Sequence, residues 1–449
     1  MNATPTPRGD LTAAFIAGAP GRTYPPDVID MAKRCLVDWM GVAVGAAGEG
    51  ATASVRRVAE GWGAAGNGQI LLGPKTAPAL AALVNGTMAH CMDYDDSHFT
   101  GGGHVGAPTW AAALALASHL GLSERETRGG FITGFEVMGR LGGGGWERMA
   151  RPLQVRGFHP TSVWGRLGAA AVAGALLGLD EARAAHALGV AATTVGGLNA
   201  SFGTMSKPFH AGKAAMDGIL AAQLAAEGFE AATHLLDADN GLAGALIQDR
   251  STSMQPVQFT EGWEVLRNEF KPYACCRAAH PVLDAARALA PRIAGREVAR
   301  VRSWLHQGAL VLAGKTDPRT PLEGKFSTAY CIALGLRGHA AVATDFTEER
   351  LRDPAVMDIV PRVTCQETPD LERYEARLEV ELADGETLHG ETAIVLGHPD
   401  NPMSWDDLET KFVGVAGPVL GSDTRPLLAA LRDFDRPGAL AEVLALVAR

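Results

Sequence analysis

The pattern of apolar and polar positions divides the chain into two kinds of sequence. From residue 1 to about 265, apolar residues recur at helical spacing in segments rich in Ala, Gly and Leu, such as PDVIDMAKRCLVDWMGVAVG and AGKAAMDGILAAQLAAEGF. Many of the residues on the apolar faces are small, which lets neighbouring helices approach closely, and convincing strand patterns are few. This part of the chain therefore predicts a tightly packed helical domain.

Strand patterns begin after residue 270. Residues 299–306 alternate in the manner of a strand, and residues 374–397 give the clearest strand signal in the chain. Within the second segment, Asp384-Gly385 is a typical hairpin turn. A smaller α+β region is therefore expected, after which NPMSWDDLETKF restores the helical pattern. The sequence alone leaves open where this C-terminal tail packs.

Length and charge limit the classes of partner. The chain has 449 residues, enough for two or more domains with substantial cores. Its net charge is −10, from 40 basic and 50 acidic residues, which argues against binding to nucleic acid or to an anionic membrane surface. The longest apolar run, Leu167–Leu179, is shorter than the ~20 residues that a membrane-spanning helix needs. A local basic pocket for a small anion stays compatible with this charge.

Cysteine usage and the N-terminus favour a cytoplasmic protein. The first ten residues, MNATPTPRGD, lack the basic and apolar regions of a secretory signal. The six cysteines are few for so long a chain and predict reduced thiols instead of a disulfide framework. Cys275 and Cys276 are adjacent, so they do not form the C-x-x-C spacing of zinc or redox sites.

The stretch HCMDYDDSHFTGGGH, residues 90–104, combines three aspartates and three histidines with a glycine run. A metal site, a phosphate loop and an acid/base centre are the three hypotheses. An EF-hand would place Gly and Glu where His98 and His104 stand, and GGGHVG does not follow a strand as a dinucleotide loop would. We therefore predict no metal and no phosphate loop; Asp95, Asp96 and His98 are expected to shape the turn.

Three further stretches carry ionisable groups in turns at helix ends. GFHPTSVWG places His159 at a helix N-terminus, where backbone N–H groups favour anions. FGTMSKPFHAGKAAMDG contains Lys207 and has His210 just before an expected helix, and KPYACCRAAHP contains Lys271 and Arg277. Each residue alone has an ordinary structural explanation, but the set favours a cleft lined with acids, bases and cations.

These stretches resemble the MmgE/PrpD family. The segments NGTMAHCMDYDDSH, GFHPTSVWG, FGTMSKPFHAGKAA, KPYACCRAAH and KFSTAY occur in the family's order between positions 85 and 330. The resemblance implies a mainly α fold, with a large all-helical domain from residues 1–268 plus 399–449 and a smaller α+β domain from residues 269–398. It also implies a homodimer without an iron–sulfur cluster or organic cofactor.

Carried over to this sequence, the resemblance implies a cleft lined by Asp93, Ser97, His104, His159, Lys207, Lys271 and Tyr330. Ser97 stands where the family more usually has threonine, and serine keeps the hydroxyl group. The family commonly has a His-Pro-Ser type of segment after the acidic turn, whereas this chain has GGGHVGAP, so the glycine run decides where His104 points.

The resemblance also suggests a role for each residue. We expect Lys207 and Lys271 to hold carboxylates, with Arg277 as a helper, and His104 and His159 to form the acid/base pair. Asp93 would orient or charge a neighbouring histidine or lysine. Ser97 and Tyr330 would hydrogen-bond the substrate. Because Lys271 opens the second domain, the site is expected to lie between the domains.

The expected chemistry is proton transfer at a carbon next to a carboxylate of a small di- or tricarboxylate. Within the family, 2-methylcitrate dehydration is the first expectation, on family frequency alone, and decarboxylation of cis-aconitate and epimerisation of iminodisuccinate stay open. A metal-dependent hydrolase that uses the Asp/His cluster, and a non-catalytic carboxylate-binding protein, are the alternatives from other classes.

Overall fold

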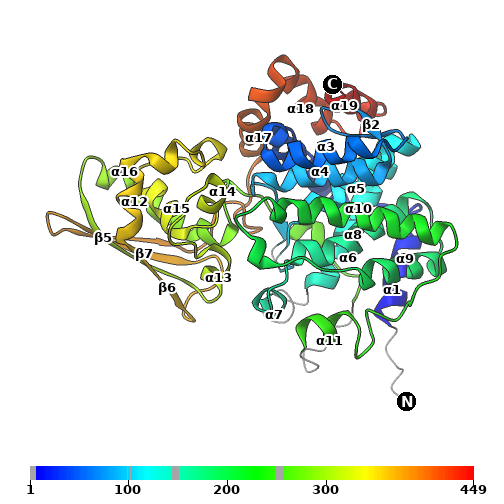
Figure 1. Ribbon diagram of the computed structural model, residues 1–449, viewed down its shortest axis with the longest axis horizontal. Helices are drawn as coiled ribbons and strands as arrows, with labels where there is room; N and C mark the ends of the chain where they lie inside the picture. The colour runs from blue at the N-terminus through cyan, green and yellow to red at the C-terminus, as the bar shows by residue number, and fades with distance from the viewer. Residues whose placement is uncertain (1–6, 99, 102, 144–150, 249–256, 449) are drawn as a thin grey trace.

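The computed structural model describes residues 7–98, 100–101, 103–143, 151–248 and 257–448. Figure 1 shows a large helical body beside a smaller body that contains the main sheet. The longer helices of the large body are α1 (Arg8–Ala17), α2 (Pro26–Gly45), α3 (Gly50–Trp62), α4 (Pro78–Cys91), α5 (Gly106–Leu120), α6 (Glu124–Gly143), α8 (Pro160–Leu176), α9 (Glu181–Thr193) and α10 (Ser206–Ala226). The shorter elements are α7 (Arg151–Val155), α11 (Leu242–Ile247), β1 (Gly68–Gln69) and β2 (Lys75–Thr76).

Helix α10 lies across the middle of the large body and packs closely against α4 and α8. Glycine makes this closeness possible, because a Cβ atom at Gly212 of α10 would lie 2.1 Å from the Leu83 carbonyl oxygen of α4. The partner residue at the crossing is Gly86, where a Cβ atom would lie 2.9 Å from the Cα atom of Gly212. The crossing fixes the two helices that carry His90 and Lys207.

The C-terminal tail packs back onto the large body. It forms α17 (Trp405–Leu420), α18 (Thr424–Arg432) and α19 (Ala439–Val447), and α17 lies against α2. Phe412 is buried against Gly41, where a Cβ atom would lie only 3.0 Å from the phenyl ring. Apolar side chains of the tail and of the first 270 residues share one hydrophobic core, which answers the question that the sequence left open.

The smaller body is a four-stranded sheet covered by helices. Its strands are β5 (Val298–His306), β6 (Val363–Thr368), β7 (Ala376–Leu382) and β8 (Thr387–Thr392), in the order β6-β5-β7-β8. β5 is parallel to β6, while β7 is antiparallel to both of its neighbours. Its helices are α12 (His280–Ile293), α13 (Ala309–Ala313), α14 (Pro321–Gly324), α15 (Thr328–Leu336) and α16 (Pro354–Met357). The predicted mainly α fold with a smaller α+β part is confirmed.

The hairpin between β7 and β8 turns where the sequence predicted it. Gly385 has φ +91°, a left-handed conformation that glycine adopts without steric cost. The apolar face of β7 is buried, and α12 packs against β7 and β8. The alternation of apolar and charged residues in this segment therefore marks the two faces of a half-buried strand.

A short ladder joins distant parts of the chain. β3 (Ser97–His98) pairs antiparallel with β4 (Asn268–Glu269), so that Ser97 lies opposite Glu269. This pairing brings the turn after α4 next to Lys271. In the described part of the chain, the structure contains no helix with the length and apolar character of a membrane span.

One predicted boundary is wrong. His210 was expected before the helix, but α10 begins at Ser206 and includes both Lys207 and His210 in its first turns. Pro208 is tolerated there because the first four N–H groups of a helix have no partner within the helix. His159, by contrast, is the N-cap residue of α8, as the sequence predicted.

Candidate active site

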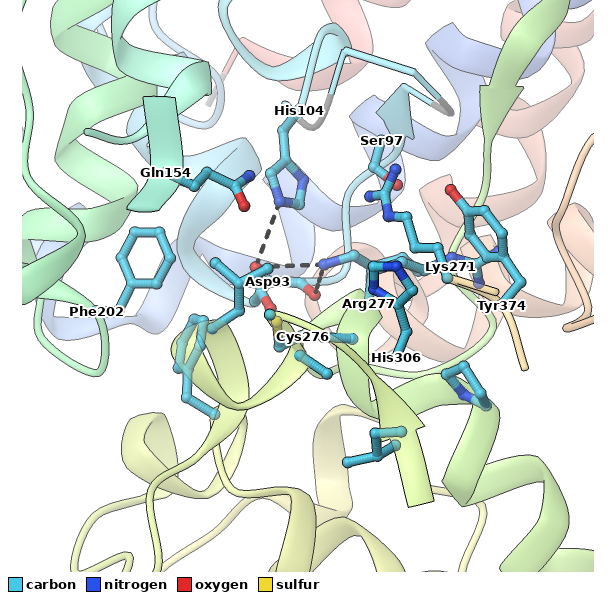
Figure 2. Close-up of a pocket in the computed structure, with 18 of the residues that line it drawn as sticks. Asp93, Ser97, His104, Gln154, Phe202, Lys271, Cys276, Arg277, His306 and Tyr374 are labelled. Atoms are coloured by element: carbon cyan, nitrogen blue, oxygen red, sulfur yellow. Dashed lines mark hydrogen bonds and ion pairs between the residues drawn. The ribbon is translucent and has the colours of Figure 1, made fainter. Parts of the chain in front are cut away.

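A pocket lies where the large body meets the smaller one, and Figure 2 shows its lining. Seven of the eight residues singled out in the sequence line it: Asp93, Ser97, His104, His159, Lys207, Lys271 and Arg277. Side chains from both bodies contribute, among them Gln154 and Phe202 on one side and His306 and Tyr374 on the other. The residues named here come from six separate segments of the sequence, which meet at one cavity.

Tyr330, which the sequence placed in the cleft, lies away from the pocket. Its side chain is fully buried in α15, and its hydroxyl donates a hydrogen bond to the Asp345 carbonyl oxygen at 3.0 Å. Its ring packs against Phe346. It is not among the residues that line the pocket. The helix turns this side chain into the core of the smaller body, so the hydroxyl is already satisfied away from any substrate.

Asp93 is the charge centre of the pocket. It follows α4 with φ +50°, a left-handed conformation that Asp adopts more readily than most residues. Its carboxylate forms ion pairs with Lys207 and with Lys271, whose Nζ lies 3.3 Å from Oδ1. Burial alone would raise the pKa of Asp93, but Lys207 and Lys271 together lower it below its usual value. Asp93 is therefore an anion that holds two buried ammonium groups.

His104 lies between two carboxylates. Its Nδ1 is 3.2 Å from Asp95 Oδ2, and its Nε2 is 3.7 Å from Asp93 Oδ1. The backbone N–H of His104 donates to Thr161 Oγ1 at 2.9 Å. Gly103 contributes its carbonyl oxygen, which accepts a hydrogen bond from the N–H of His98 at 2.9 Å. These bonds aim His104 into the pocket despite the glycine run.

The environment of His104 favours its neutral form in the free protein. Burial lowers its pKa and outweighs the raising effect of Asp95, and Lys271 and Lys207 lower it further. Asp95 is shared with His90, whose Nδ1 lies 2.9 Å from Asp95 Oδ2. Burial lowers the pKa of His90 to about 3.

His159 approaches the pocket from the start of α8. Its backbone N–H donates to the Gly197 carbonyl oxygen at 3.0 Å, and its Nδ1 lies 3.0 Å from His210 Nδ1. Burial, and after it the charge of Lys207, lowers the pKa of His159 well below its usual value. For His210, burial lowers the pKa to about 4. At neutral pH one Nδ1 carries the single proton between these rings and the other accepts it.

Arg277 lines the pocket with a buried guanidinium whose hydrogen bonds are incomplete. Its Nη1 donates to the Leu396 carbonyl oxygen at 3.1 Å, and its Nη2 lies 3.5 Å from Glu269 Oε1. Among the described residues, neither Nε nor Nη2 has a hydrogen-bond partner, although the side chain is buried. Ser97 Oγ donates to the other oxygen of Glu269 at 3.3 Å. A guanidinium can hold a carboxylate ligand by charge and by hydrogen bonds, which makes Arg277 a candidate for that role.

The donor atoms of His90, Asp93, Asp95 and His104 lie within 4.8 Å of one another, a spacing that could hold a metal ion. The charges around these four side chains disfavour a bound metal ion. Asp93 is already neutralised by two ammonium groups, and a divalent cation here would be repelled by both of them. The arrangement favours an acid/base centre over a metal centre.

Sequence reasoning undervalued His90, Asp95 and His210. Asp96 and His98 do shape the turn: Asp96 accepts from the N–H of Gly106 at 3.0 Å, and His98 accepts from the N–H of Gly101 at 2.9 Å. Asp95 instead connects two histidine rings. The available signal was the helical position of His90, which places its ring at the end of α4 beside the turn.

Two family models and several known proteins match the chain. The family described as MmgE/PrpD N-terminal domain matches residues 10–255, and the MmgE/PrpD C-terminal domain matches residues 273–433. Human cis-aconitate decarboxylase is 30% identical over 361 residues, which cover 77% of this chain and 74% of the human protein. The mouse cis-aconitate decarboxylase is 27% identical over 92% of this chain and 87% of its own length. The cis-aconitate decarboxylase of Aspergillus terreus is 26% identical over 77% and 76%.

Proposed function

The chain belongs to the MmgE/PrpD family, and we propose that it is a lyase that decarboxylates a small unsaturated tricarboxylate of the cis-aconitate type. One observation carries the proposal: three buried cations, the buried His159 and the partly buried His104, from both bodies, line a single pocket. The relatives move our preference from 2-methylcitrate dehydration, the first expectation from family frequency, to decarboxylation. The homodimer and the cytoplasmic location stay predictions.

The reaction defines what the pocket has to supply. In cis-aconitate, one carboxylate sits on a CH₂ group next to the C=C bond. When the C–C bond to this carboxylate breaks, CO₂ leaves and its electron pair forms a new C=C bond at the CH₂ carbon. The old double bond shifts its electron pair onto the carbon beside another carboxylate, and that carbon takes one proton. The site must bind three anionic groups, stabilise the shifted charge and deliver a single proton.

The cations suit the first two tasks. Lys207 and Lys271 share Asp93 as their anion, and Arg277 also lines the pocket. We assign these three side chains to the carboxylates that stay on the product. Their burial strengthens each interaction with an anion, because little water remains to screen it.

We assign the proton donor to His104, with His159 as the second member of the pair. His104 lines the pocket and is oriented from behind by Asp95, which fixes the ring as a carboxylate does in other acid/base sites. In the free protein Lys207 and Lys271 hold its pKa down. The negative charge of a bound tricarboxylate offsets the positive charge of the two lysines and favours a protonated histidine. Binding therefore raises the pKa of His104, so that His104 carries the proton that the reaction consumes.

This coupling predicts different pH profiles for the free and the bound enzyme. The pKa of His104 in the free protein lies below 6.5, so kcat/KM should fall about tenfold per pH unit above that value. The profile of kcat reports the bound enzyme, in which the pKa is raised, so its decline should begin at higher pH. Steady-state rates between about pH 5 and pH 9 measure both. If the pH profiles of kcat and kcat/KM superimpose, substrate binding does not raise the pKa of His104 and this part of the proposal is wrong.

The direct test is a substrate panel followed by NMR in D₂O with EDTA present. We expect cis-aconitate to lose CO₂ and the product to carry one deuterium at the carbon that takes the proton. Matched incubations with 2-methylcitrate and iminodisuccinate test the sister reactions of the family. The variant His104→Asn, purified in parallel, shows whether a contaminating enzyme forms the product. Turnover of 2-methylcitrate without decarboxylation of cis-aconitate would replace our assignment with dehydration. Decarboxylation that occurs in a matched incubation without EDTA but not with it would show that the reaction needs a metal ion and would contradict the proposed acid/base site.

A further inference from the structure

Three buried ammonium groups converge on the turn that carries Asp93. Lys325 Nζ donates to the Met92 carbonyl oxygen at 2.6 Å, Lys271 Nζ to that of Asp93 at 2.9 Å, and Lys411 Nζ to that of Tyr94 at 2.6 Å. These are three consecutive carbonyl groups. The lysines come from three distant segments: one follows β4, one follows α14 and one lies on α17.

The turn has a physical need for such donors. It follows the C-terminus of α4, where the last carbonyl groups have no partner within the helix and carry its partial negative charge. The left-handed φ of Asp93, +50°, ends the helical hydrogen-bond pattern and separates the directions of the neighbouring carbonyl groups. Cations at these three oxygens therefore stabilise a backbone conformation that a residue with a side chain seldom adopts.

Stability alone does not explain Lys325. Its side chain is buried, and no carboxylate of the described residues lies within 4.0 Å of its Nζ. A buried charge without a paired carboxylate usually costs stability, and an apolar residue of similar shape would serve packing better. Lys411 differs because its Nζ also donates to Asp38 Oδ1 at 2.6 Å and lies 4.0 Å from the centre of the Tyr94 ring.

We propose that Lys325 and Lys411 are positioning residues, which fix the backbone of Asp93 so that its carboxylate meets Lys207, Lys271 and His104. Neither lines the pocket, so they act through the turn and not on the substrate. Lys325 belongs to the smaller body and Lys411 to the C-terminal tail. Asp93 is therefore in place only when the large body, the smaller body and the tail are docked together. The expected effect of these lysines on kcat rests on the proposed function, whereas their effect on the backbone of the turn does not.

The test is the variant Lys325→Met, which keeps the side-chain length and removes the donor. We expect kcat for cis-aconitate to fall about 10- to 100-fold, since small displacements of a catalytic group have effects of this order. KM should change much less, and Tm should stay the same or rise because a buried charge is removed. Hydrogen–deuterium exchange of peptides that cover residues 92–96 should become faster, with tricarballylate bound and without it.

Thr328→Val is the matched control. Thr328 is buried three residues further along the chain, and its Oγ1 donates to the Ala313 carbonyl oxygen at 2.8 Å, away from the turn. This variant loses one buried hydrogen bond to a carbonyl, as Lys325→Met does, but leaves the Met92 carbonyl group untouched. We expect a lower Tm with unchanged kcat and unchanged exchange at residues 92–96.

Other outcomes would contradict the positioning role, or would show that the proposed function is wrong while the positioning role is still testable. Unchanged kcat and exchange in Lys325→Met would overturn it, as would an equal loss of kcat in Thr328→Val. If Lys325→Met does not fold, Lys411→Met combined with Asp38→Asn removes the third donor together with its buried partner and is judged by the same measurements. If the wild-type protein does not decarboxylate cis-aconitate, the proposed function fails, and the exchange of residues 92–96 alone decides the positioning role.

Discussion

Replacing His104 with asparagine is expected to lower kcat for decarboxylation by about 10²- to 10⁴-fold, the scale of a lost general acid. Asparagine keeps a donor that can reach Asp95 but has no proton to release near neutral pH. The side chain lines the pocket and its backbone N–H is held by Thr161, so the fold should persist. Steady-state kinetics and the thermal unfolding midpoint measure the two effects separately.

The control for this prediction is His389→Asn, the same substitution at an exposed position on β8. It should change neither kcat nor Tm. For His104→Asn, kcat and kcat/KM should fall by similar factors, because the proton is needed in the transition state and not for binding. A variant that keeps most of its kcat would transfer the role of proton donor to His159 or to water, and His159→Asn would then carry the larger loss.

Much of the fold could be read from local patterns. The alternation of residues 374–397 predicted β7 and β8 because one face of the hairpin is buried, and the Asp384-Gly385 turn fixed its register. The packing of the C-terminal tail could not be read in the same way. Contacts such as Lys411 with Tyr94 join residues 317 positions apart, and no local pattern encodes which surface an amphipathic helix will cover.

The candidate site, too, could be predicted from the sequence only in part. A histidine before Pro160 at a helix start marked His159 without knowledge of the fold, because helix N-termini have a recognisable sequence. Tyr330 was misplaced because a motif gives a position along the chain but not the side of the helix that a residue faces. Asp95 was undervalued because its importance comes from two histidines that only the folded chain brings to the same carboxylate.

Replacing Asp93 with asparagine should destabilise the protein by about 3–5 kcal/mol at pH 7, because it leaves two buried ammonium groups without their shared anion. Asparagine tolerates the left-handed conformation that φ +50° requires, so the loss reports charge and not backbone strain. The folded-state pKa of Asp93 is depressed, so its contribution is present above the unfolded-state value of about 3.9 and is lost as the pH falls through the folded-state value. The gap between wild type and variant should therefore narrow only below about pH 4. Denaturant unfolding at several pH values measures it.

The same variant should respond more strongly to an anionic ligand. Lys207 and Lys271 pair with Asp93 in the wild type. If the proposed site is right, a tricarboxylate would share these lysines with Asp93, whereas in Asp93→Asn the ligand would be their principal anion. Tricarballylate should therefore raise the Tm of the variant by more than that of the wild type, while kcat falls. Asp384→Asn, which removes an exposed carboxylate paired with Arg296, is the control and should show a much smaller change. If ligand raised both midpoints equally, Asp93 would not be the anion that the substrate competes with, and the lysines would have to be assigned to another partner.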